Sequence, residues 1–208
     1  MSARLPGRTV GRTVTGRTVL RDTVRARHEA MIIDGTYSYD GANTGYPYEL
    51  QAGCLMAVIT ASGKYCPLKR TVLAADASTS DTDVVVDDAR FFKAGDPIKV
   101  SDADADVVAS IDYDTNTITL VTGLSGDVST DEVVIATGDL AGAETAVGIL
   151  DEFVDLEDAQ TQVVGDRQSG KLIVQGFVLD AMVLGDLAAA RADTSNQLSL
   201  IHFQDQFQ

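Results

Sequence analysis

The segment from Gly165 to Lys171 has the G-x-x-x-x-G-K spacing of a phosphate-binding loop. Such a loop needs a Ser or Thr after the lysine to bind Mg²⁺, and a helix whose first N–H groups face the phosphate. Here the next residue is Leu172, and the following KLIVQGFVL has the pattern of a strand. The sequence therefore predicts a turn at 166–170 between two strands and no phosphate site.

Two acidic clusters have residue types that can bind a cation or perform acid–base chemistry. Residues 102–106 resemble the start of an EF-hand loop, but Val107 and Tyr113 stand where that loop needs Gly and Glu. The run at 151–158 has no histidine, metal-binding pattern or nucleophile motif beside it. We expect both clusters to be solvated surface, and we expect no catalytic, cofactor-binding or metal-binding residues.

Cys54 and Cys66 are the two cysteines, and they fall on a predicted hairpin. They could form a disulfide if they lie opposite each other, but the pattern favours two small, partly buried free thiols. Zinc is not indicated, because there is no CxxC and the two histidines, His28 and His202, are far apart.

The charge divides sharply along the chain. The net charge is −15, but residues 1–28 carry seven arginines and one aspartate, a net charge of +6, which leaves −21 for the remainder. So acidic a body repels nucleic acid and anionic membranes, and we expect neither as a direct partner. No apolar stretch is long enough to span a bilayer, and the N-terminus lacks the apolar core of a secretory signal.

The N-terminal segment is repetitive and basic. GRTV occurs at 7–10, 11–14 and 16–19, with glycines that interrupt any helix and Thr-Val pairs that favour extended chain. We predict a flexible basic arm over residues 1–34, of which 28 residues could extend about 90 Å. The arm could add a strand to a partner's sheet, or it could be a disordered tail without a role.

Residues 35–49 have the composition of a loop, with glycines and a proline. They also contain four of the six tyrosines. Tyrosine suits contacts because it is rigid, apolar and polar at its tip. The loop could contact a neighbouring subunit or anchor itself on its own chain; the residues concerned are Tyr37, Tyr39, Tyr46 and Tyr48.

The middle of the chain predicts a small antiparallel β-barrel or sandwich over 71–138. Short β segments recur there between Asp, Gly, Ser and Thr clusters, with a hairpin turn at 114–116. The predicted strands are 71–75, 82–88, 96–102, 107–114, 117–123 and 131–138.

The segments on either side of this insertion share a composition that differs from it and is rich in small and apolar residues. We interpret 35–70 and 139–208 as one discontinuous domain interrupted by 71–138. Its predicted elements are strands at 54–60, 65–68, 146–150, 162–165, 171–179 and 198–203, and a short helix at 184–192.

The order of these elements resembles the lambda-type head decoration proteins of tailed bacteriophages. The resemblance covers 106 residues, 35–70 and 139–208. It is carried by Ala52-Gly53-Cys54-Leu55, Thr60 to Pro67, Ala146 to Leu150, Gly176-Phe177-Val178 and Leu187 to Ala192.

The resemblance implies a mainly β, compact (β-tulip-like) fold with a short helix, and a homotrimer on the outer surface of the virion capsid. There such proteins clamp neighbouring major capsid proteins, and their N-terminal arm orders on the shell. The chain departs from the family in its longer basic arm and in the insertion. The implied capsid-binding residues of the arm are Arg8, Arg12, Arg17, Arg21, Arg25 and Arg27.

Other functions stay open at this point. The chain could be a tail, baseplate or fibre component whose 71–138 module binds a receptor or glycan. An enzyme is disfavoured by the lack of a catalytic pattern, and nucleic-acid binding is disfavoured by the acidic body.

Overall fold

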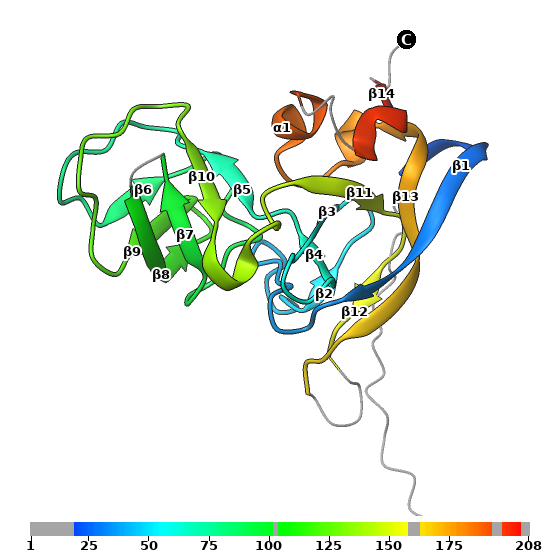
Figure 1. Cartoon of the computed structure of the whole chain (residues 1–208), viewed down its shortest axis with the longest axis horizontal. Helices are drawn as coiled ribbons and strands as arrows, with labels where there is room; N and C mark the ends of the chain where they lie inside the picture. Colours follow the sequence, from blue (N-terminus) through cyan, green and yellow to red (C-terminus); the bar gives the residue numbers. More distant parts are fainter. Residues whose placement is uncertain (1–18, 102–103, 158–162, 193–196, 205–208) are drawn as a thin grey trace, which may run out of the picture.

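The protein is mainly β, as the sequence predicts. The computed structural model describes residues 19–101, 104–157, 163–192 and 197–204. Within these ranges the strands form two six-stranded sheets and one two-stranded sheet. The two large sheets lie side by side along the long axis of the molecule (Figure 1).

The first sheet closes on itself. Its order is β1-β4-β3-β11-β13-β14, and β1 also pairs with β13, which joins five of the strands into a ring. The buried side chains inside include Leu55, Ile149 and Ile173. The strands are β1 (Leu20–Ile33), β3 (Leu55–Val58), β4 (Tyr65–Pro67), β11 (Ala146–Leu150), β13 (Arg167–Leu179) and β14 (Ile201–Gln204).

The second sheet comes from one continuous part of the chain. Its order is β5-β10-β7-β8-β9-β6, and a bridge between Leu73 and Val86 joins its two ends. Burial alternates along β7, β9 and β10, which is why these short segments form strands around one core. The strands are β5 (Arg70–Val72), β6 (Asp83–Val85), β7 (Pro97–Val100), β8 (Asp104–Asp112), β9 (Thr117–Leu120) and β10 (Val133–Ala136).

The remaining elements are short. β2 (Glu49–Leu50) pairs with β12 (Val154–Asp155), and α1 (Leu187–Ala192) is the α-helix of the described chain. Of the 3₁₀ turns, η1 (Gly138–Leu140) connects β10 to β11, and η2 (Asp180–Met182) and η3 (Gln197–Leu200) lie on either side of α1. Among the described residues, no helix has the length and apolarity needed to cross a membrane.

The prediction of a flexible arm over 1–34 is wrong for residues 20–33. They form β1, which pairs antiparallel with β13 from Leu20↔Val178 to Ile33↔Arg167. Met31 and Ile33 are buried, and β13 satisfies backbone groups of the strand. The part of the predicted arm at 1–18 lies outside the described residues.

The C-terminal part differs from prediction in three places. The predicted turn at 166–170 is wrong, because β13 begins at Arg167 and its pairing with β1 continues through this segment. The predicted strand at 162–165 is reduced to a bridge between Glu157 and Val164, with residue 162 outside the described residues. The predicted strand at 198–203 begins as the 3₁₀ turn η3 and becomes β14 only at Ile201.

The other predicted elements are confirmed in kind. β11 has the predicted bounds, the helix is shorter than predicted, and β5 to β10 fall on the six predicted strands of the insertion. A turn lies at 113–116, where Asn116 has the positive φ, 52°, that hairpin turns need.

Candidate functional site

The described residues with the most unusual polar chemistry lie where the two large sheets meet. The chain passes from the first sheet to the second at Lys69, whose side chain is fully buried. Its ammonium Nζ lies 2.6 Å from an oxygen of Asp96. The backbone of Lys69 completes the crossing, since its N–H donates to Ala143 and its carbonyl accepts from Ala136.

A second ion pair crosses the same junction. Arg90 Nε donates to Asp40 Oδ1 at 3.2 Å, and the Arg90 carbonyl accepts from the N–H of Gly41 at 2.8 Å. Burial raises the pKa of Asp40 above its ordinary value, and the charge of Arg90 opposes this rise. No sequence pattern predicts these two ion pairs, because in each pair one partner comes from the segment 35–70 and the other from the insertion 71–138.

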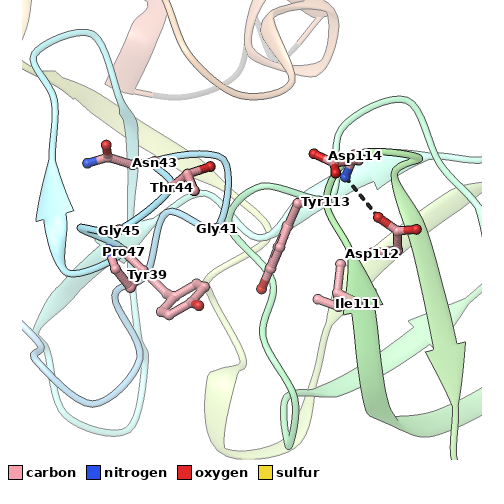
Figure 2. Close-up of a pocket in the computed structure, with 10 residues that line it drawn as sticks. All are labelled: Tyr39, Gly41, Asn43, Thr44, Gly45, Pro47, Ile111, Asp112, Tyr113 and Asp114. Atoms are coloured by element: carbon pink, nitrogen blue, oxygen red, sulfur yellow. Dashed lines mark hydrogen bonds between the residues drawn. The ribbon is translucent and has the colours of Figure 1, made fainter.

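A pocket of about 470 Å³ opens beside this junction. Figure 2 shows that the 39–47 loop forms one wall and the tip of the β8–β9 hairpin forms the other. The rings of Tyr39 and Tyr113 are 6.0 Å apart. The lining residues are Tyr39, Gly41, Asn43, Thr44, Gly45, Pro47, Ile111, Asp112, Tyr113 and Asp114.

Several polar groups of the pocket hold the walls in place. The Asn43 amide donates to the carbonyls of Tyr46 and Glu49. The Asp112 carboxylate accepts from the N–H of Asp114, and the Tyr113 hydroxyl donates to the carbonyl of Phe92. The pocket therefore offers two aromatic rings and the hairpin carboxylates, an arrangement suited to binding a polar ring such as a sugar.

The tyrosines predicted as subunit contacts are all half-buried in their own chain. Tyr39 makes an edge contact with Tyr48 at 5.5 Å, and Lys93 Nζ lies over the ring of Tyr37 at 5.9 Å. Tyr48 also packs against the core of the first sheet. They anchor the loop to this chain, and a contact of Tyr37, Tyr39, Tyr46 or Tyr48 with a second subunit stays a prediction.

The arginines predicted to bind the capsid fall into three groups. Arg8, Arg12 and Arg17 lie outside the described residues. The backbone of Arg21 and Arg25 belongs to β1. The side chain of Arg27 is 64% exposed and pairs with Glu29 at 2.8 Å.

The structure shows the surroundings of both cysteines and of His28. Cys54 and Cys66 form no disulfide, and both are fully buried where the sequence predicts partly buried thiols. Burial raises the pKa of the Cys66 thiol to about 12. His28 is not isolated: its Nε2 lies 3.0 Å from Asp151 Oδ2. The pairing of β1 with β13, which the sequence did not predict, contributes to bringing them together.

Asp106 and Glu152, described members of the two acidic clusters, bond to nearby groups of their own chain. Burial acts to raise the pKa of Asp106, but the N–H groups of Val107, Thr122 and Gly123 donate to its carboxylate and together lower the pKa. Glu152 accepts from the hydroxyl of Ser169. The described part of the chain contains no group of three or more His, Cys, Asp or Glu side chains placed to hold a metal ion.

Comparison with known proteins gives this chain no family: no family model matches it, and no curated protein is similar to it.

Proposed function

We propose that this chain is a structural protein of a phage head that binds the outer surface of the capsid as a homotrimer. It stabilises the shell by holding neighbouring major capsid proteins together. The support is the order of elements in the resemblance, which the strands β3, β4, β11 and β13 and the helix α1 follow. The mainly β fold and the short helix α1 agree with that resemblance.

The single observation that carries the proposal is how the basic segment joins the body. Residues 1–18 contain four arginines and no acidic residue, and Val19 and Leu20, which follow, are buried in the first sheet. A load on this segment therefore acts on β1, which is held by its pairing with β13. A protein that stabilises a shell needs such a connection between the segment that binds the capsid and its folded body.

The charges explain how an acidic protein grips a surface. Each exposed ion pair contributes only about 0.2–1 kcal/mol. Three arms in one trimer act together, because the first attachment raises the effective concentration of the others. The body, whose charge is strongly negative, resists association elsewhere.

The test is co-sedimentation of the purified protein with capsids that lack it. We expect replacement of Arg4, Arg8, Arg12 and Arg17 by Gln to abolish binding and replacement by Lys to preserve most of it. Deletion of 1–18 should also abolish binding while the melting temperature stays unchanged. Binding by the Gln variant equal to that of the unmodified chain would refute the role of the segment, and a monomeric mass in native mass spectrometry would refute the trimer.

A second candidate is a tail, baseplate or fibre component that binds a receptor or glycan. The pocket of Tyr39 and Tyr113 favours it, because sugars stack on aromatic rings and hydrogen-bond to carboxylates. Electron cryomicroscopy of the parent particle separates the two: density over the whole shell supports cementing, and density at one vertex supports the second candidate.

A further inference from the structure

Two loops of the second sheet carry the same short sequence pattern. Residues 76–81 are DASTSD and residues 127–132 are DVSTDE, so both follow D-x-S-T-x-[D/E]. The first loop precedes β6 and the second precedes β10. They are 51 residues apart in the chain, and the structure brings them into direct contact.

Each loop gives its first carboxylate to the other loop. Asp76 Oδ1 accepts from the N–H and the hydroxyl of Thr130, at 2.7 and 2.9 Å. Asp127 Oδ1 accepts from the N–H and the hydroxyl of Thr79, at 2.8 and 2.9 Å. The same two bonds are thus made in each direction, four in all.

The backbones of the loops are joined in the same reciprocal way. The N–H of Ala77 donates to the carbonyl of Val128, and the N–H of Val128 donates to the carbonyl of Ala77, both at 2.9 Å. Both side chains are buried. A local twofold axis therefore passes between these two residues.

The loops also share one internal conformation. The third residue of each donates its N–H to the carboxylate of the sixth, Ser78 to Asp81 at 2.7 Å and Ser129 to Glu132 at 3.2 Å. The fifth residue of each has a left-handed backbone, with φ of 74° and 71°. Non-glycine residues rarely adopt this conformation, so its presence at both positions indicates one repeated structure.

The flanking chain obeys the same symmetry. The N–H of Leu73, before the first loop, donates to the sixth residue of the second loop at 2.8 Å. The N–H of Leu124, before the second loop, donates to the sixth residue of the first at 3.0 Å. Their carbonyls accept from the fifth residue of the opposite loop, at 2.9 and 2.8 Å.

The strands around the loops correspond as well, with one insertion. β5 pairs antiparallel with β10, and β9 pairs antiparallel with β6. The chain before the second loop is longer than the chain before the first. The N–H of Leu120 donates to the carbonyl of residue 82, whereas the N–H of Leu124, four residues later, donates to the carbonyl of residue 81. Val121, the first of the extra residues, is 63% exposed.

We propose that the two loops form a single clasp that opens and closes as one unit and keeps the second sheet closed. Neither loop can leave without breaking the bonds that order the other. The bridge between Leu73 and Val86, which joins the ends of the sheet, lies directly beside the clasp. Opening the clasp therefore weakens the junction that joins the two ends of the second sheet.

Hydrogen exchange on the full-length protein tests the clasp. In Asp76→Ala, which removes the acceptor for Thr130, we expect exchange roughly tenfold faster at the amides of both loops, including Thr79. Asp127→Ala should produce the same pattern. The matched control is Asp83→Ala, which removes an acceptor for the Thr119 hydroxyl in the same sheet and should leave both loops protected.

Faster exchange at Thr130 alone would overturn the proposal, because the loops would then open independently. If either alanine variant fails to fold, Thr79→Val and Thr130→Val remove single hydroxyl donors and permit the same comparison. The double variant of Asp76 and Asp127 gives a second criterion. Its loss of melting temperature should be close to that of one single variant, and a fully additive loss would also contradict a single clasp.

Discussion

The ammonium of Lys69 lies 2.6 Å from a carboxylate oxygen of Asp96, and the two side chains are only 0% and 1% exposed. Lys69 stands at the crossing from the first sheet to the second, and Asp96 directly precedes β7. The same ammonium donates to the carbonyl of Phe91 at 2.6 Å, and Asp96 also accepts from the N–H of Lys93. The pair is therefore shielded from solvent, and it holds the chain at Lys69 against the second sheet.

Removal of one partner should be costly because it leaves a buried charge unpaired. We expect Lys69→Met to reduce the free energy of unfolding by about 3–5 kcal/mol, measured by denaturant titration. Adding Asp96→Asn should restore part of the loss, because the amide stays uncharged and still accepts from Lys93. Lys171→Met, at an exposed lysine, is the control and should cost less than about 1 kcal/mol. Equal losses at Lys69 and Lys171 would contradict this role.

The junction also depends on a glycine that contacts an aromatic ring. A Cβ on Gly41 would lie 2.1 Å from two atoms of the Tyr113 ring. Gly41→Ala should push the 39–47 loop away from the hairpin and cost on the order of 1–3 kcal/mol in thermal unfolding. Gly126→Ala, where no atom lies within 4 Å, should change stability little. The expectation fails if the two variants melt alike.

The strands were predictable where burial follows local sequence, and the long-range pairings were not. The alternation of PIKV, TITL and VVIA marks β7, β9 and β10 from the chain alone. The sequence does not indicate β1 as a strand, because its partner, β13, lies more than a hundred residues away. The same pairing makes a strand of the polar start of β13, RQSG, where the sequence predicts a turn.

The junction residues could not be predicted, whereas the clasp left a sequence signal. A lysine between Leu68 and Arg70 gives no sign that it is buried, since its partner is fixed only by the fold. The repeated D-x-S-T, in contrast, is visible at Asp76 and Asp127. Such a short internal repeat indicates two loops of one conformation.

The thiols should be chemically inert in the folded protein. Burial raises the pKa of Cys66 to about 12, so almost no thiolate exists near neutral pH, and Cys54 is equally buried. We expect no fast labelling by a thiol reagent at pH 8 and rapid labelling of both cysteines in denaturant. Rapid labelling of the native protein would show that the first sheet opens readily.

Acid should weaken the second sheet through the clasp. Hydrogen bonds from Thr130 and Thr79 lower the pKa values of Asp76 and Asp127 below their ordinary 3.8. Their stabilising effect is therefore present above pH 3.8 and is lost as the pH falls through the folded values. Asp40 acts in the opposite sense, because burial raises its pKa, so its ionisation costs stability above pH 3.8.

Unfolding measured from about pH 5 to pH 2 should thus show stability falling below about pH 4. The double variant Asp76→Ala, Asp127→Ala should show a shallower fall, because the groups that titrate are gone. An identical slope in the variant would assign the acid sensitivity to other carboxylates.

Truncation of the N-terminus separates the basic segment from the first sheet. Deletion of 1–18 should leave the melting temperature unchanged, since it keeps the buried Val19 and the whole of β1. Deletion of 1–28 removes Val19 and Leu20, which are buried, and leaves much of β13 without its partner. We expect that variant to lose the cooperative melting of the first sheet, as seen by circular dichroism. If deletion of 1–28 melts like the full chain, β1 is not part of the stable core, and a load on the basic segment cannot be borne by its pairing with β13.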